Sequence, residues 1–83
     1  MKNKERIIIY GRDTCPFCTY SVDLCIAEGI PHVFLNYSEQ PDILDECKDF
    51  YNHPTVPITL SNNLQTGLVS FIGGYSDLVE HLS

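Results

Sequence analysis

The spacing of apolar positions in the first third of the chain predicts a strand followed by a helix. An apolar, β-branched run spans residues 6–11, which is typical of a strand buried on both faces. Over residues 16–28 apolar side chains recur at the spacing of one helix face, with Thr14 as the expected N-cap and Gly29 ending the helix. The apolar face of this predicted helix consists of Cys18, Val22, Cys25 and Ile26.

The middle of the chain predicts a second strand and a second helix. Residues 32–37 contain a short apolar run that is typical of a strand. A strand, a helix and a second strand in so short a stretch favour a right-handed crossover, which makes the two strands parallel. The next helix is expected to begin near Pro41 and to run to about Tyr51. Its buried face is expected to contain Ile43, Leu44, Cys47 and either Phe50 or Tyr51.

The last third of the chain predicts a hairpin and a short helix. Residues 58–60 are typical of a short alternating strand, and residues 68–72 of the strand that returns beside it. Turn-forming residues occupy positions 61–63 and 65–67, and Ser76 is expected to cap a helix that ends at Leu82. The expected order is therefore β-α-β-α-β-β-α, an α/β fold with a four-stranded mixed sheet flanked by helices.

Size and charge narrow the class of protein. The chain of 83 residues has room for one core, so residues 1–83 are expected to form a single domain. Its net charge of −6 disfavours nucleic acid and anionic membranes as partners, because both attract basic surfaces. We find neither a secretory signal nor an apolar stretch of about 20 residues that could cross a membrane, so we expect the protein in the cytoplasm. We also expect a monomer.

The chemistry is concentrated in Cys15 and Cys18, which are separated by two residues directly before the first helix. A thiol at a helix N-terminus meets free N–H groups and the positive end of the helix dipole, which stabilise a thiolate. In a reducing compartment such a pair is typical of a reversible dithiol and disulfide. The alternative for Cys18 is a plain buried cysteine. Cys25 and Cys47 lie on predicted apolar faces and are interpreted as core residues.

Three separated motifs resemble those of glutaredoxins, a family with the thioredoxin-like fold. They are Cys15-Pro16-Phe17-Cys18, Thr55-Val56-Pro57 and Gly73-Gly74-Tyr75-Ser76-Asp77, and the resemblance covers essentially the whole chain. It implies a glutathione-dependent thiol–disulfide oxidoreductase that reduces protein disulfides and glutathione mixed disulfides. Cys15 would be the nucleophile and Cys18 the resolving thiol. The resemblance implies no permanently bound cofactor and no metal, with glutathione as reductant and with disulfide-containing or glutathionylated proteins as partners.

The same resemblance implies where glutathione binds. Arg12 stands where the family usually carries a lysine for the glycine carboxylate, although a solvated loop arginine is the alternative. The peptide bond before Pro57 is expected to be cis. The backbone N–H and C=O of Val56 would then bind the cysteinyl part of glutathione. Ser76 and Asp77 would hold the γ-glutamyl end, and both also suit a helix start. The implied binding residues are Arg12, Phe17, Thr55, Val56, Pro57, Gly74, Ser76 and Asp77.

Other functions stay open at this point. The protein could be a dedicated electron donor to a protein such as ribonucleotide reductase, re-reduced by thioredoxin reductase. An iron–sulfur carrier and a zinc site built from Cys15, Cys18, Cys47 and His53 are weaker hypotheses, because Pro16 stiffens the turn and structural zinc favours closely spaced ligand pairs. The segment 62–67 makes the hairpin longer than is usual in the family, and we expect a surface loop there that contacts a partner protein.

Overall fold

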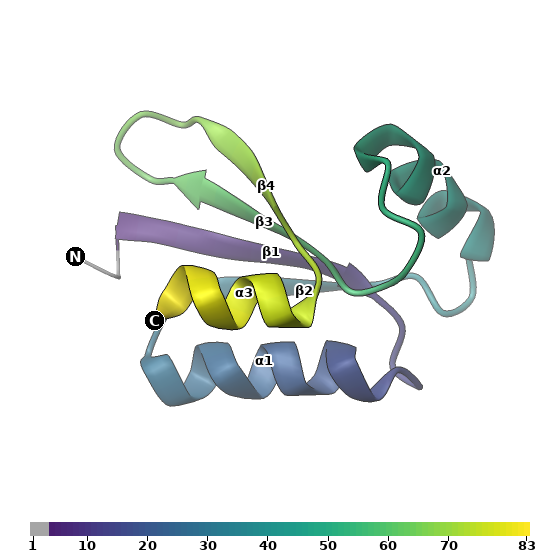
Figure 1. Ribbon diagram of the computed structural model, residues 1–83, viewed down its shortest axis with the longest axis horizontal. Helices are drawn as coiled ribbons and strands as arrows, with labels where there is room; N and C mark the ends of the chain where they lie inside the picture. Colours follow the sequence, from purple (N-terminus) through teal and green to yellow (C-terminus); the bar gives the residue numbers. More distant parts are fainter. Residues whose placement is uncertain (1–3) are drawn as a thin grey trace.

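A mixed β-sheet with helices on both faces is the framework of the computed structural model, which describes residues 4–83 (Figure 1). The predicted element order is confirmed. The elements are β1 (Glu5–Gly11), α1 (Pro16–Glu28), β2 (His32–Asn36), α2 (Pro41–Tyr51), β3 (Ile58–Asn63), β4 (Val69–Gly73) and α3 (Tyr75–Leu82). Within residues 4–83 no helix combines the length and the apolar character that a membrane crossing needs.

The four strands lie in the order β2-β1-β3-β4. β1 runs parallel to β2, with Ile9 opposite Phe34, while β3 is antiparallel to both β1 and β4. The predicted parallel pair and antiparallel hairpin are therefore both present. The connection through α1 makes β1 and β2 parallel. Cys15 and Cys18 follow β1 directly, so they lie near the C-terminal ends of these two strands.

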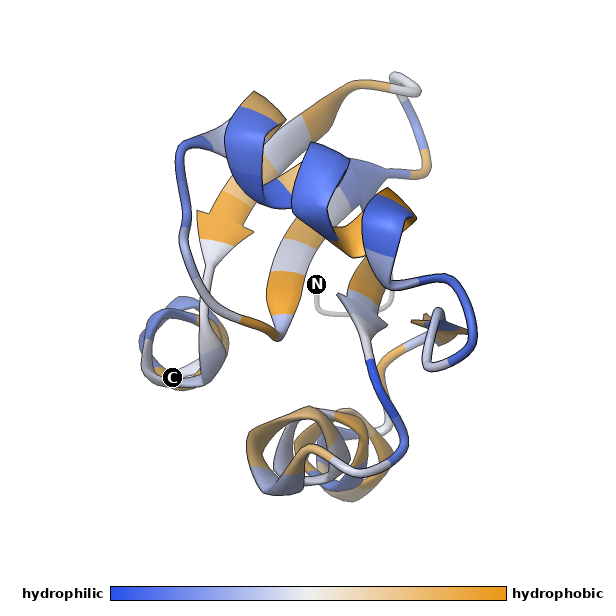
Figure 2. Ribbon diagram, turned by 90° about the vertical axis from the view of Figure 1, so that its right-hand side faces the viewer, coloured by the Kyte–Doolittle hydropathy of each residue, from blue (hydrophilic) through white to orange (hydrophobic). Residues whose placement is uncertain are grey.

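The helices divide between the two faces of the sheet, with α1 and α3 on one side and α2 on the other (Figures 1 and 2). Ile7 and Ile9 of β1 are fully buried on the side of α1 and α3. The expectation that β1 is buried on both faces is wrong, because Ile8 and Tyr10 are only half-buried beneath the single helix α2. The main core consists of Ile7, Ile9, Cys25, Ile30, Leu78 and Leu82.

The buried face of α1 is rotated from the predicted one. Cys18, Ser21 and Cys25 are the buried residues, whereas Val22 is half-buried and Ile26 is 63% exposed. Ser21 is tolerated inside because its hydroxyl donates to the Phe17 carbonyl at 2.8 Å, so no polar group is left unpaired. The packing of α1 against both the sheet and α3 selects this face.

α2 buries less than its sequence predicts. Only Leu44 is fully buried, and Phe50 is 80% exposed. Tyr51 is the aromatic residue that packs inward, with its ring stacked on Phe71 of β4 at 5.2 Å between centroids. Cys47 is half-buried, so its assignment as a core residue is wrong.

Two helix starts differ from the predicted ones. Cys15, not Thr14, is the N-cap of α1, because its sulfur accepts the Cys18 N–H. Gly74, not Ser76, is the N-cap of α3, because the Asp77 carboxylate reaches back to the Gly74 N–H at 3.0 Å. In both places a residue three positions into the helix fixes its first turn.

The first strand of the hairpin, β3, is longer than its sequence predicts. Residues 61–63 continue β3 instead of forming a turn, and residues 58–61 are all buried, so the expected alternation is absent. Thr59 is accommodated inside because its hydroxyl donates to the Gly73 carbonyl at 2.8 Å. The turn itself is held by Asn63, whose side-chain oxygen accepts from Gln65 N at 2.9 Å and Thr66 N at 3.1 Å.

Cys25 allows a test of the core through alkaline unfolding. Burial, and after it the Glu5 carboxylate, raise the pKa of Cys25 from 9.0 to about 11. The unfolded chain loses this proton near pH 9 and the folded chain near pH 11, so the stabilising contribution is complete below pH 9 and is lost as pH rises through 11. We expect Cys25→Ala to lower stability at neutral pH but to reduce its alkaline decline by about 2 kcal/mol.

Urea unfolding under reducing conditions, followed by circular dichroism between about pH 8.5 and pH 11, measures this decline. Cys47→Ala is the matched control, because Cys47 is only half-buried. An equal decline in Cys25→Ala and the unsubstituted protein would show that the Cys25 proton is not linked to folding.

Candidate active site

The first turn of α1 fixes the position of Cys15 beyond the C-terminal end of β1. Its half-buried sulfur accepts the Cys18 N–H at 3.3 Å, and its carbonyl accepts the Thr19 N–H at 3.2 Å. The N–H groups of a first helical turn have no partners within the helix, so a sulfur in this position faces donors that favour negative charge. This is the arrangement that a thiolate nucleophile requires.

Cys18 lies behind Cys15 and has no exposed surface. Burial, followed by the hydrogen bond with Cys15, raises the pKa of Cys18 to about 12. Its seat depends on Gly11, the last residue of β1, because a Cβ at that position would collide with the Cys18 sulfur. Both cysteines are free thiols. The pair therefore consists of one accessible sulfur and one that is protected and protonated.

The loop before β3 approaches Cys15 from the opposite side. The Val56–Pro57 peptide bond is cis, as predicted, and the Cys15 thiol donates to the Val56 carbonyl at 3.8 Å. Within residues 4–83 the Val56 N–H has no hydrogen-bond partner, so this backbone group is available to a ligand. The loop thus places a backbone donor and acceptor beside the reactive sulfur.

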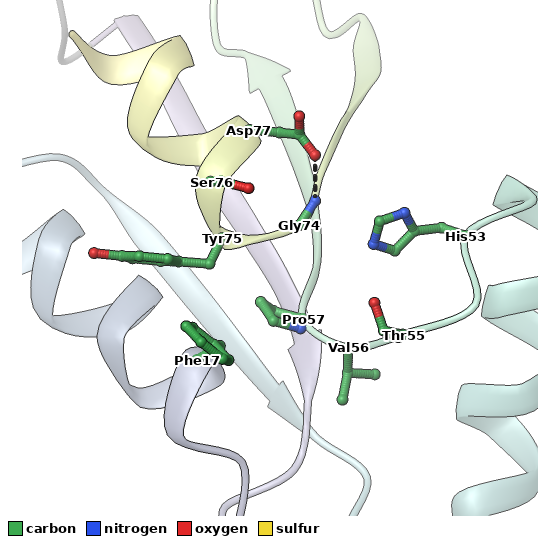
Figure 3. A pocket seen from close by; sticks show the side chains of 9 residues that line it. All are labelled: Phe17, His53, Thr55, Val56, Pro57, Gly74, Tyr75, Ser76 and Asp77. Atoms are coloured by element: carbon green, nitrogen blue, oxygen red, sulfur yellow. Dashed lines mark hydrogen bonds between the residues drawn. The ribbon is translucent and has the colours of Figure 1, made fainter.

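A pocket of about 260 Å³ opens next to this loop (Figure 3). It brings together seven of the eight residues to which the motifs assign glutathione binding. They are Phe17, Thr55, Val56, Pro57, Gly74, Ser76 and Asp77. Two further residues, His53 and Tyr75, complete the lining. Residues from α1, from the loop before β3 and from α3 therefore meet in one cavity.

The start of α3 lines one end of the pocket with Gly74 and Asp77. The Asp77 carboxylate accepts the Gly74 N–H, drawn as a dashed line in Figure 3. Gly73 has a φ of +135°, and a Cβ there would collide with the Asp77 side chain, which explains the glycine at position 73. Negative charge and helix N–H groups consequently stand side by side.

Aromatic rings form one wall of the pocket. Phe17, which is 54% exposed, packs against Tyr75 at 5.8 Å between ring centroids, and Tyr20 lies 5.6 Å from Phe17. Figure 3 shows the Tyr75 ring beside Phe17, with its hydroxyl directed away from Pro57. Tyr75 was not predicted as a site residue, although it occupies the variable position of the Gly-Gly-x-Ser-Asp motif. Its ring therefore extends the apolar surface around Phe17.

Arg12 is the predicted binding residue that the pocket does not include. Its side chain is exposed, and its backbone carbonyl accepts the Cys15 N–H at 3.3 Å. The neighbouring Asp13 is turned toward the β2–α2 connection, where the Ser38 hydroxyl donates to its carboxylate at 2.8 Å. The role of Arg12 toward a carboxylate stays a prediction.

His53 enters the site from the loop that follows α2. Its place is fixed by a backbone hydrogen bond to the Lys48 carbonyl at 2.9 Å and by packing of its ring against Phe71. The sequence offers one signal for this residue, its position four residues before Pro57. Residues 4–83 contain no group of three or more His, Cys, Asp and Glu side chains that could hold a metal ion.

The chain matches the family model described as Glutaredoxin over residues 7–63. It belongs to the glutaredoxin family. Solved structures agree in fold. The wheat glutaredoxin has a TM-score of 0.74 at 21% identity, over 89% of this chain and 66% of that one. The dithiolic glutaredoxin from Trypanosoma brucei brucei has a TM-score of 0.68 at 26% identity, over 98% and 88%.

A third similar structure is the glutaredoxin-like NrdH-redoxin from Escherichia coli, whose structure is described as explaining a thioredoxin-like activity profile. Its TM-score is 0.65 at 20% identity, over 94% of this chain and 95% of that one. No curated protein matches the chain. This glutaredoxin thus spans about two thirds of the wheat chain and nearly the full length of the redoxin. Membership in the family supports thiol–disulfide oxidoreductase chemistry.

The contrast between the four thiols gives a direct chemical test. Burial raises the pKa of Cys18, Cys25 and Cys47, so each is largely protonated at neutral pH. For a pKa of about 12 the thiolate fraction at pH 7 is on the order of 10⁻⁵. We expect iodoacetamide to modify reduced protein at Cys15 first, as read by peptide mass mapping.

Two variants separate the sulfur atoms in this reaction. Cys18→Ser should keep the fast modification of Cys15, whereas in Cys15→Ser the buried Cys18 and Cys25 should react slowly until the pH approaches about 11. Fast alkylation of Cys18 at pH 7 in the Cys15→Ser protein would contradict the buried, protonated state of that thiol.

Proposed function

We propose that this protein is a glutathione-dependent thiol–disulfide oxidoreductase that acts on protein disulfides and glutathione mixed disulfides. The observation that carries the proposal is the position of the Cys15 sulfur. It lies at the N-terminus of α1, 3.8 Å from the carbonyl oxygen of Val56, and Val56 is one of the residues that line the pocket. We place this activity in the cytoplasm, in a monomer without a permanently bound cofactor.

The geometry supports a two-step reaction. The Cys15 thiolate attacks one sulfur of the target disulfide, a Cys15 mixed disulfide forms, and the other sulfur leaves as a thiolate. Cys18 then loses its proton and attacks the Cys15 sulfur, which gives the Cys15–Cys18 disulfide and releases the second thiol. Two molecules of glutathione return the dithiol and leave as oxidised glutathione.

The pocket suits glutathione as the source of electrons. A cysteinyl group joined to Cys15 would lie beside the Val56 backbone N–H and C=O, which can pair with an extended peptide. The γ-glutamyl end carries both a carboxylate and an ammonium group. The start of α3 offers helix N–H groups for the first and the Asp77 carboxylate for the second. The pocket therefore complements the chemistry of this end of the tripeptide.

Replacement of each cysteine tests the reaction. Cys15→Ser should abolish turnover of a glutathione mixed disulfide, because no other thiol is both accessible and positioned beside Val56. Cys18→Ser should keep this monothiol reaction but lose reduction of protein disulfides, which needs the resolving thiol. The measurement is NADPH consumption with glutathione and glutathione reductase. Absence of turnover in the unsubstituted protein would overturn the proposal.

A second function has a specific observation in its favour. Arg12 is not among the residues that line the pocket, so the expected anchor for the glycine carboxylate is missing from it. The chain also covers nearly the whole NrdH-redoxin from Escherichia coli. The alternative is therefore a dedicated electron donor to a protein such as ribonucleotide reductase, which thioredoxin reductase would re-reduce.

The source of electrons separates the two functions. If glutathione is the reductant, the oxidised protein should be reduced by glutathione and its reductase at least about tenfold faster than by thioredoxin reductase, because the tripeptide gains binding energy in the pocket. Both rates can be measured by loss of NADPH absorbance with one protein disulfide as final acceptor. The reverse order would favour the electron-donor function.

A further inference from the structure

His53 is held at the wall of the pocket, and its ring makes no hydrogen bond to any other residue in the range 4–83. Its backbone N–H donates to the end of α2, and its ring packs edge-on against Phe71 with 5.8 Å between centroids and 65° between planes. Within residues 4–83 its Nε2 has no partner and less than 1 Å² of exposed surface. Buried polar atoms in folded proteins are nearly always paired, so this nitrogen requires an explanation.

The unpaired nitrogen points toward the start of α3. A Cβ placed on Gly74 would lie 3.4 Å from Nε2, so this atom is the part of the ring nearest to the helix start. Figure 3 shows the His53 ring with a nitrogen edge turned toward Gly74 and Pro57. A rotation that turned Nε2 further into the pocket would break no hydrogen bond of the side chain.

The charges around the pocket show which ligand group Nε2 would meet. Among the nine lining residues Asp77 is the only carboxylate, and there is no lysine or arginine. His53 is therefore the only lining side chain with a nitrogen that can donate a hydrogen bond. An imidazole donates from Nε2 either when it is protonated or when the neutral ring carries its proton there. A carboxylate at the start of α3 would thus have helix N–H groups on one side and His53 on the other.

We propose that His53 determines specificity for the γ-glutamyl group, with Nε2 donating to the α-carboxylate while Asp77 pairs with the α-ammonium. The proposal rests on the glutathione-dependent function proposed above. The glycine end of glutathione carries a carboxylate alone, whereas this end of the pocket presents an anion and donors together. The two features match an amino-acid head group, which only the γ-glutamyl end has.

The test compares thiol peptides that differ at one end. In the Cys18→Ser protein, Cys15 attacks a mixed disulfide of a chromophoric thiol, takes up the peptide and releases the chromophore as its thiolate. The peptides are glutathione, γ-glutamylcysteine and cysteinylglycine, and stopped-flow absorbance gives a second-order rate constant for each. His53→Leu removes the donor, His53→Gln keeps one, and His32→Asn is the matched control at the far end of β2.

We expect His53→Leu to slow the reactions of glutathione and γ-glutamylcysteine about tenfold, the size of one charge-assisted hydrogen bond. The loss should be in the concentration for half-saturation, not in the maximal rate. Cysteinylglycine should react at an unchanged rate, His53→Gln should recover part of the loss, and His32→Asn should change nothing. An unchanged cysteinylglycine rate also shows that the Cys15 site is still folded.

Two outcomes would overturn the assignment of His53, and both differ from a failure of the proposed function. A strong preference for γ-glutamyl peptides that His53→Leu leaves intact would refute the role of His53 alone. An equal loss with all three peptides would mean that His53 merely supports the fold. Equal rates for all three peptides in the parent protein would instead refute glutathione recognition itself.

Discussion

The hydrogen bond from the Cys18 N–H to the Cys15 sulfur is the interaction on which the site depends. It makes Cys15 the N-cap of α1, so the helix start and the proposed nucleophile have the same position. The bond is possible because β1 ends in Gly11, which leaves room for the Cys18 sulfur. A strand end, a helix start and a pair of thiols are therefore positioned together. The Val56 loop and α3 add the binding surface around this point.

Local signals in the sequence were sufficient for the order of the elements and for the bounds of α1 and α2. α1 was predicted from Pro16 to Glu28 because a proline and a glycine mark its two ends, and these effects act within a few residues. The buried faces were harder to predict. Ile26 is exposed and Ser21 is buried because α1 packs against a sheet and a helix that come later in the chain. The length of β3 likewise depends on its pairing with β1 and β4.

The candidate site divides in the same way. The three motifs predicted seven of the lining residues, because short segments carry the cap, the cis peptide bond and the glycine pair. His53 and Tyr75 could not be assigned from sequence with the same force. His53 reaches the pocket only because the end of α2 lies beside Phe71 of β4, and Tyr75 only because α3 packs beside α1. Arg12 shows the converse, a residue near Cys15 in sequence that lies outside the pocket.

The proposed recognition of glutathione through the main chain at Val56 has an evolutionary consequence. The N–H and C=O that would pair with the ligand belong to every amino acid except proline, which lacks the N–H, so selection at this position would act on the path of the chain more than on the side chain. Related sequences can therefore drift far apart while the same contact persists. The fold itself shows how far such divergence can go, since the wheat glutaredoxin shares it at 21% identity and a TM-score of 0.74.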